Sequence, residues 1–331
     1  MSKLATITAV EHYVPENVID NKYFEGFLET THEWIMERTG IAERRFATEG
    51  GTSDLIVPAA KKLMESKGLG PDDIDCVVVC TVTPDYFFPN TAAVVQRKLG
   101  LTNAWGFDLS AACSGFVFGI VTAAKLVEGG AAKRLLLCGS DKMTSILDQS
   151  DRTQAVLFGD GAGVCLIEMS DEPGFGILDQ ILRIDGAGQP HLHMKAGGSA
   201  RPSTIETVQN KEHYITQEGQ PVFKAAVKGM ADVSAEIMEK NNLKSEDIAW
   251  LVPHQANLRI IDATARRMGI DKSKVMINIE KYGNTTAGTI PICLSEWHKN
   301  GDIKKGDNLV LASFGAGFTW GAVYLKWNMN D

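Results

Sequence analysis

The stretch FDLSAACSGFVFGIVTAAKL, residues 107–126, decides the fold of this chain. It begins like a strand and continues as an apolar helix, which places Cys113 at or just before a helix N-terminus. The helix dipole and free backbone N–H groups there favour a thiolate over a thiol. Gly115 and Gly119 have no side chains, so another backbone can pack closely against the helix. A small buried core cysteine is the alternative interpretation of Cys113.

Strand and helix signals alternate on both sides of this stretch. Strands are expected at residues 77–82, 106–109 and 134–140, with one helix ending near Gly100 and the next beginning at Ser114. This order predicts an α/β protein with buried, largely parallel strands. No low-complexity tract or proline-rich linker divides the chain.

An internal echo at a spacing of about 170 residues suggests a duplicated domain. Its landmarks are an acidic start to an apolar strand, a basic helix end closed by glycine, and an apolar strand leading into a turn. They recur in order at residues 73–75 and 247–249, 97–101 and 266–270, and 135–140 and 309–315. Two halves, residues 1–175 and 176–331, are therefore expected to face each other about a pseudo-twofold axis. A site between them could draw residues from both.

Composition restricts the class of protein further. With 44% hydrophobic and 22% charged residues, the 331-residue chain is expected to bury a sizeable core. A net charge of −8 argues against nucleic-acid binding. The N-terminus lacks a signal-peptide core, and the apolar run that ends at Lys125 is too short to span a membrane. We therefore expect a cytoplasmic protein without membrane insertion, whose six cysteines are free thiols.

Two more motifs carry chemically useful side chains. His254 lies in LVPHQANLRI, after an apolar strand and before an amphipathic helix, where α/β folds present side chains to ligands. Asn284 lies in KYGNTTAGTIP, a Gly- and Thr-rich turn before an apolar helix. Either residue alone would more often be structural. The glycine-rich loop SFGAGFTWG, residues 313–321, could let backbone approach a substrate.

Taken in order, this cysteine, histidine and asparagine resemble the thiolase superfamily, and specifically β-ketoacyl-ACP synthase III. The resemblance covers nearly the whole chain. It includes AACSGF, PHQAN, GNTTAG, EWIMERTGIAERR (33–45), DRTQAVLFGDGAG (151–163) and FGAGFTWG (314–321). It implies a thiolase-like fold layered α-β-α-β-α, with the nucleophilic cysteine in the first half and the histidine and asparagine in the second. It also implies a homodimer.

The resemblance implies a mechanism and its substrates. Cys113 would accept an acyl group from acyl-CoA, and the backbone N–H groups of Cys113 and Ala316 would hold the oxyanion. His254 and Asn284 would donate hydrogen bonds to the enolate formed when malonyl-ACP loses CO₂. The product would be a 3-oxoacyl-ACP that starts fatty-acid synthesis. CoA thioesters and acyl carrier protein are then substrates and partners, and no cofactor or metal is implied.

The family's binding positions are carried over in the same way. Coenzyme A and pantetheine would be bound by Thr30, Trp34, Arg38, Arg152, Gly219, Phe223, Ala256 and Asn257. Trp34 could stack on adenine while the arginines neutralise phosphate. Phe88 would close the acyl channel from across the dimer interface. Lys224, Arg259, Arg266 and Arg267 would dock the acidic carrier protein. Half-buried packing and solvated helix faces are the alternative interpretations of these side chains.

Several alternatives stay open at this point. The pair His191 and His193 has metal-ligand spacing but no third ligand, and the GDGAG run at 159–163 resembles a tight turn more than a nucleotide loop. A related Cys-His-Asn enzyme could instead serve secondary metabolism or join two long acyl chains. A catalytically silent binding protein on the same fold is the rival from another class. The sequence leaves open the primer, the pathway and whether the extender is always carried on ACP.

Overall fold

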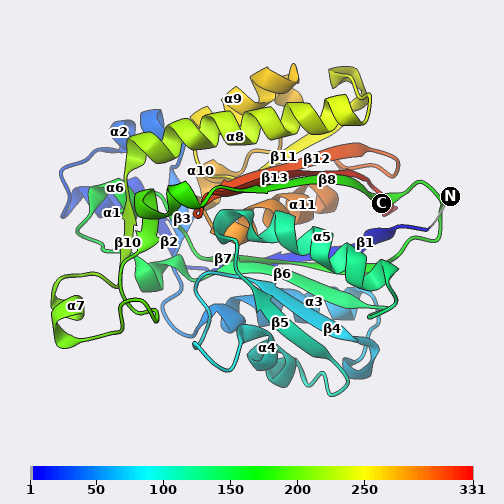
Figure 1. The fold of residues 1–331 in the computed structure, drawn as a ribbon, viewed down its shortest axis with the longest axis horizontal. Helices are drawn as coiled ribbons and strands as arrows, with labels where there is room; N and C mark the ends of the chain where they lie inside the picture. Colours follow the sequence, from blue (N-terminus) through cyan, green and yellow to red (C-terminus); the bar gives the residue numbers. More distant parts are fainter. Residues whose placement is uncertain (1–2, 331) are drawn as a thin grey trace.

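The first β-sheet of the molecule has five strands. The computed structural model describes residues 3–330, and Figure 1 shows its layered arrangement. The strand order is β1 (Ala5–Tyr13), β7 (Gly161–Met169), β6 (Leu135–Asp141), β4 (Cys76–Cys80) and β5 (Trp105–Leu109). β4 runs parallel to β5 and β6, whereas β7 is antiparallel to both β1 and β6.

The second sheet repeats most of this arrangement. Its order is β8 (Gly176–Ile184), β13 (Thr319–Lys326), β12 (Asn308–Gly315) and β11 (Trp250–Pro253). β11 and β12 are parallel, and the other two pairs are antiparallel, as in the first sheet from β4 to β1. The position of β5 is taken by a single parallel bridge between Leu251 and Val275.

The sequence echo corresponds to these matched elements. Both β4 and β11 follow a short 3-10 turn, η1 (Pro71–Asp73) or η5 (Ser245–Asp247). The helices α4 (Thr91–Leu99) and α9 (Leu258–Met268) end on Gly100 and Gly269, whose φ angles are 69° and 67°. A side chain is disfavoured in this left-handed conformation, so glycine closes both helices. The division of the chain at residues 175 and 176 stays a prediction; it falls immediately before β8.

One expectation about the sheets was wrong. The strands are not largely parallel, because each sheet mixes parallel and antiparallel pairs. The cause lies after β6 and after β12, where the chain reverses direction instead of continuing into a crossover helix. A strand that returns after a reversal pairs antiparallel. The GDGAG run leads into β7, as the sequence predicted, and its last three residues belong to that strand. The expected tight turn is absent, because the backbone N–H groups of Gly159 and Asp160 donate to the distant carbonyls of Asn284 and Arg45.

Helices separate and cover the two sheets, which gives the predicted α-β-α-β-α layering (Figure 1). α5 (Gly115–Glu128) and α11 (Thr289–Lys299) form the middle layer. α3 (Thr52–Ser66) and α4 cover the outer face of the first sheet, and α8 (Gly219–Lys240) and α9 cover the second. No helix formed by residues 3–330 combines the length and apolar character that crossing a bilayer requires.

The remaining elements are short, and some of them carry residues that line the pocket described below. They are β2 (Val18–Asp20), α1 (Asn21–Glu25), α2 (His32–Thr39), β3 (Glu43–Arg45), η2 (Ala112–Ser114), η3 (Met143–Ile146), α6 (Arg152–Ala155), η4 (Gly186–His191), β9 (Leu192–Met194), α7 (Ile205–Gln209), β10 (Ile215–Gln217), η6 (Lys272–Lys274), α10 (Ile279–Tyr282) and η7 (Thr286–Gly288).

The middle helix α5 packs on β4 because two of its residues are glycines. A Cβ atom added at Gly119 would lie 2.3 Å from Cys80 Sγ and 3.0 Å from Leu137 Cδ1. One added at Gly115 would lie 3.3 Å from Cys80 Cβ. Cys80 and Cys76 fill core space here, as expected for thiols in an apolar strand. The short distance between helix and strand is what places η2, and Cys113 with it, at the carboxyl end of β4.

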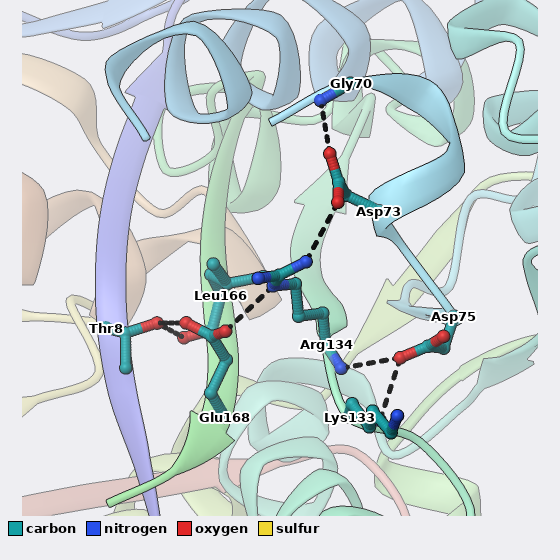
Figure 2. Close-up of polar contacts among 8 residues, drawn as sticks. All are labelled: Thr8, Gly70, Asp73, Asp75, Lys133, Arg134, Leu166 and Glu168. Carbon is teal, nitrogen blue, oxygen red and sulfur yellow. Dashed lines mark hydrogen bonds and ion pairs between the residues drawn. The ribbon is translucent and has the colours of Figure 1, made fainter. Parts of the chain in front are cut away.

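A polar network closes the other end of the first sheet (Figure 2). The guanidinium of Arg134, at the amino end of β6, lies 3.0 Å from Asp73 Oδ1 and 3.1 Å from Glu168 Oε1. Glu168 also accepts a hydrogen bond from the hydroxyl of Thr8 on β1. Asp75 Oδ2 accepts the backbone N–H of Arg134 at 2.8 Å. These contacts fix the amino ends of β4 and β6, so that their carboxyl ends meet at the site.

We expect Gly119→Ala to destabilise the fold by about 1–3 kcal/mol, because the new methyl group overlaps Cys80 Sγ. This loss would exceed the roughly 0.5–1 kcal/mol that alanine gains over glycine in a helix. The measurement is the free energy of unfolding in urea. Cys80→Ala combined with Gly119→Ala should recover part of the loss, and Gly198→Ala, which meets no atom within 4 Å, is the control. Equal stability of Gly119→Ala and wild type would contradict the packing argument.

Candidate active site

Cys113 lies in η2, between β5 and α5, at the base of a pocket. Ser313 Oγ donates to its carbonyl at 2.8 Å, and Ser114 Oγ donates to the carbonyl of Thr319 at 2.9 Å, so β12 and β13 hold this turn. The helix start was expected to favour a thiolate. Burial instead raises the pKa of the Cys113 thiol to about 12, and the charge of Asp141 acts in the same direction. The cysteine of the unliganded protein is therefore a thiol.

His254 follows β11 and is anchored by its backbone N–H, which donates to Ala312 O at 2.8 Å. Its side chain is buried, and its Nδ1 lies 2.8 Å from Thr289 Oγ1, at the start of α11. Within residues 3–330 its Nε2 has no hydrogen-bond partner. Burial lowers the pKa of His254 to about 3, because the charged ring would lose its water. The imidazole is therefore neutral, and Nε2 is the nitrogen left for a substrate.

Asn284 is held in the pocket by both backbone and side chain. Its N–H donates to Leu157 O at 2.9 Å, and its carbonyl accepts from Gly159 N at 3.1 Å. Its side-chain Oδ1 accepts the backbone N–H of Thr286 at 2.8 Å. Because Oδ1 is engaged, the Nδ2 group of the amide remains as a donor. A hydrogen bond from this side chain to Cys113 lowers the pKa of the thiol and so opposes the effect of burial.

The three predicted catalytic residues line one pocket of about 430 Å³. Its wall is mostly apolar and includes Phe314, Met230 and Leu192. Water is displaced easily from such a surface, and hydrogen bonds inside it are correspondingly strong. The site can therefore hold an acyl chain against the thiol while donors approach the carbonyl from the opposite side.

The predicted oxyanion residues come together through a glycine. β12 ends at Gly315, where an added Cβ would lie 2.7 Å from the backbone nitrogen of Cys113. Glycine thus lets the turn that carries Ala316 come close to the Cys113 N–H. Thr319 Oγ1 donates to Ala316 O at 3.0 Å, which ties the carbonyl side of that turn to β13. The oxyanion role of the two N–H groups stays a prediction.

Seven of the eight predicted coenzyme A positions line the same pocket. They are Trp34, Arg38, Arg152, Gly219, Phe223, Ala256 and Asn257. Thr30 lies outside the lining, and its hydroxyl is buried without a partner among residues 3–330. The guanidinium carbon of Arg38 lies 4.5 Å from the centre of the Trp34 ring, and that of Arg152 lies 4.7 Å from it. A stacked adenine would therefore have to replace one of the two guanidinium groups.

The four cations predicted to dock a carrier protein are all exposed but are not equivalent. Arg259 lines the pocket, with its guanidinium 4.8 Å from the ring of Phe223. Arg267 is at the other end of α9, where its Nε lies 3.4 Å from Asp232 Oδ1. Lys224 extends from the first turns of α8, and Arg266 neighbours Arg267. The four cations therefore do not form a uniform patch, because Asp232 offsets the charge of Arg267.

Phe88 does not line the pocket of its own chain. Its side chain is 88% exposed, in the segment between β4 and α4. The histidine pair that was set aside makes contacts within the protein. His191 Nδ1 contacts Glu218, and His193 Nδ1 contacts the carbonyl of Gln189. Among residues 3–330, no three His, Cys, Asp or Glu side chains converge as metal ligands do.

Sequence reasoning missed several residues of the site. Thr286 and Thr289 belong to the GNTTAGTIP motif but were assigned no role, although they hold Asn284 and His254. Asp141 ends a strand that was recognised only as apolar. Its position directly after the β6 run, at the carboxyl edge of parallel strands, was the available signal.

Two matched sheets around two buried helices, with a cysteine, a histidine and an asparagine meeting between them, define a thiolase-fold condensing enzyme. Two family models match the chain: 3-oxoacyl-[acyl-carrier-protein] synthase III over residues 107–186, and the C-terminal part of the same family over residues 238–327.

Relatives match over nearly the full length. The β-ketoacyl-ACP synthase III of Chlorobaculum tepidum is 54% identical, covering 98% of this chain and 99% of the relative. That of Phocaeicola vulgatus is 51% identical, covering 98% and 96%. The crystal structure of the Thermus thermophilus β-ketoacyl-ACP synthase III is 40% identical with a TM-score of 0.90, covering 98% and 99%. The chain belongs to the 3-oxoacyl-ACP synthase III family. It is an acyltransferase of the kind that initiates fatty-acid synthesis, as the motifs predicted.

We expect the imidazole of His254 to stay neutral from roughly pH 8 down to pH 5, because its pKa lies well below the usual 6.5. The measurement is a pH titration of the protein with ¹⁵N-labelled histidine, followed by NMR. The spectrum of His254→Ala identifies the signals that belong to this residue. A His254 signal that titrates with a midpoint near 6.5 would contradict a buried neutral ring.

Proposed function

We propose that this protein condenses an acyl-CoA primer, acetyl-CoA or a short or branched acyl-CoA, with malonyl-ACP through an acyl-cysteine at Cys113. The observation that carries the proposal is that Cys113, His254 and Asn284 meet at the base of one apolar pocket. The mouth of that pocket presents the guanidinium groups of Arg38 and Arg152, which suit the phosphates of coenzyme A.

In the first half-reaction, the sulfur of Cys113 attacks the thioester carbonyl of the primer. The new carbon–sulfur bond forms as the bond to coenzyme A breaks, and the proton of the Cys113 thiol leaves with the coenzyme A sulfur. The backbone N–H groups of Cys113 and Ala316 hold the tetrahedral oxyanion. A covalent intermediate divides the condensation into two easier steps.

In the second half-reaction, malonyl-ACP loses CO₂ and its thioester becomes an enolate. Asn284 Nδ2 and His254 Nε2 donate hydrogen bonds to the enolate oxygen. A neutral ring can donate from Nε2 only when Nδ1 is the acceptor. In the unliganded protein the hydroxyl of Thr289 donates to Thr286 O at 3.0 Å, so in the proposed step it turns to donate to Nδ1, which lies 2.8 Å away. When the hydroxyl of Thr289 turns away from the Thr286 carbonyl, that carbonyl still accepts the backbone N–H of Thr289. The enolate carbon attacks the acyl-cysteine, and the released sulfur takes up one proton.

The function is proposed for a homodimer. Within residues 3–330, β5 is an edge strand that pairs with β4 alone, and Trp105 on it is 43% exposed. Phe87 and Phe88 are 82% and 88% exposed in the segment that follows β4. An edge strand beside exposed aromatic side chains is suited to pairing with a second copy. Phe88 of each copy would then limit the length of the primer in the partner's acyl channel.

We expect Cys113→Ala to fold but to lose transfer of the acyl group from acyl-CoA, because no sulfur remains to form the thioester. Intact-protein mass spectrometry after incubation with a panel of acyl-CoAs measures the mass gain on the wild type and also ranks the primers. Cys293→Ala, which removes a buried thiol of the core, is the matched control and should keep the mass gain. Acylation of Cys113→Ala at another site with full condensation would overturn the assignment.

We expect Arg259→Glu to weaken condensation with malonyl-ACP in a salt-dependent way, because an acidic carrier protein needs local positive charge beside the pocket of this protein of net charge −8. The measurement is the KM for malonyl-ACP at low and high salt, with acylation by acyl-CoA as the reference. Arg267→Glu is the control, since Asp232 already offsets its charge, and its effect should be smaller. Equal losses in both half-reactions of Arg259→Glu would instead indicate coenzyme A binding or misfolding.

A further inference from the structure

Asp141, the last residue of β6, is a fully buried carboxylate with no role in the two half-reactions described above. Its Oδ1 accepts four hydrogen bonds from the segment that follows β4. Their donors are Thr81 Oγ1 at 2.8 Å, Val82 N at 2.7 Å, Thr83 N at 3.0 Å and Thr83 Oγ1 at 2.9 Å. These bonds fix the carboxylate rigidly to the first sheet.

The second oxygen of Asp141 faces the Asn284 segment. Oδ2 accepts the hydroxyl of Thr286, and the backbone nitrogen of Ala287 lies 3.5 Å away. No cation bonds to this carboxylate among the hydrogen bonds and ion pairs of residues 3–330. Burial raises the pKa of Asp141, and its many donors oppose that rise. An acceptor with two oxygens and no hydrogen of its own suits a position surrounded by donors on both sides.

Thr286 is held in an unusual backbone conformation. Its φ angle is +50°, a strained value that β-branched residues rarely adopt. Such a conformation persists only where the surroundings impose it. The bond from its hydroxyl to Asp141 is one contact that compensates this strain.

The conformation of Thr286 determines how Asn284 is oriented. The Thr286 N–H donates to Asn284 Oδ1 at 2.8 Å. If the Asn284 amide were turned by 180°, its NH₂ group would face this N–H, and two donors would oppose each other. The bond therefore leaves Nδ2, the hydrogen-bond donor, directed to Cys113 and the substrate.

We infer that Asp141 is a positioning residue for the condensation: through the hydroxyl of Thr286 it fixes the backbone N–H that orients the Asn284 amide as a donor. The inference rests on the proposed role of Asn284 in the second half-reaction. In this inference a residue of the first sheet, Asp141, orients a hydrogen-bond donor of the second half of the chain, the Asn284 amide. The proposed mechanism assigns this donor to the enolate of the second half-reaction, whereas backbone N–H groups hold the oxyanion of the first, so loss of the donor should impair condensation more than acylation.

The test compares Thr286→Val, Thr286→Ser and Asp141→Asn with wild type. Acylation is measured as mass gain from acyl-CoA, and decarboxylation as release of labelled CO₂ from malonyl-ACP by enzyme that is already acylated. Valine keeps the branched shape but removes the hydroxyl, so Thr286→Val should lose about tenfold or more in decarboxylation, as when an oxyanion donor is misplaced. Acylation should stay within about threefold of wild type. Serine keeps the hydroxyl, and Thr286→Ser should retain most of the decarboxylation rate.

Two further variants keep the outcomes distinct. Asp108→Asn changes another carboxylate of the first sheet, which accepts the N–H groups of Thr91 and Ala92 at the start of α4, and it should leave the ratio of the two half-reactions unchanged. Asn284→Ala tests the proposed function itself. If Asn284→Ala decarboxylates normally, the role of Asn284 fails. If Asn284→Ala is impaired while Thr286→Val matches wild type, the inference about Asp141 is overturned, even if Asp141→Asn does not fold.

Discussion

The structure depends on the burial of two helices between two sheets. α5 and α11 are covered on both sides, and each starts at the pocket: α5 directly after the turn of Cys113, and α11 with Thr289, which contacts His254. A helix can be enclosed this closely only if small residues face the strands, which is why Gly119 meets Cys80. The active site is thus part of the core, so its geometry is as fixed as the packing around it.

Enclosure also determines the electrostatics of the site. Burial raises the pKa of the Cys113 thiol to about 12 and lowers that of the His254 imidazole to about 3, so both groups are neutral without substrate. Separating charge between two groups enclosed in this way carries a large desolvation cost. In the proposed mechanism the protein instead provides oriented dipoles, namely backbone N–H groups and the Asn284 amide, which stabilise charge as the substrate develops it.

Much of this could be predicted from the sequence because the strong signals are local. The apolar helix after Cys113, the strand before His254 and the family motifs predicted the fold, and they selected residues that the structure brings to one pocket: Cys113, His254 and Asn284, with seven of the proposed coenzyme A positions. The antiparallel strands were missed because an apolar run does not reveal its direction. The high pKa of Cys113 was missed because a helix start is visible in the sequence, whereas desolvation depends on atoms from both halves. The contact between Asp141 and Thr286 joins positions 145 residues apart, and no local pattern records it.

The turn that carries Cys113 has a counterpart in the other half of the molecule. η2 and η7 each precede a middle-layer helix, and the first residue of each has a left-handed backbone, with φ of 49° at Ala112 and 50° at Thr286. In this correspondence Ala287 occupies the place of Cys113. The same backbone shape therefore does two different things in one molecule. In η2 it presents a side chain to the pocket, and in η7 it presents a backbone N–H, that of Thr286, to the side chain of Asn284.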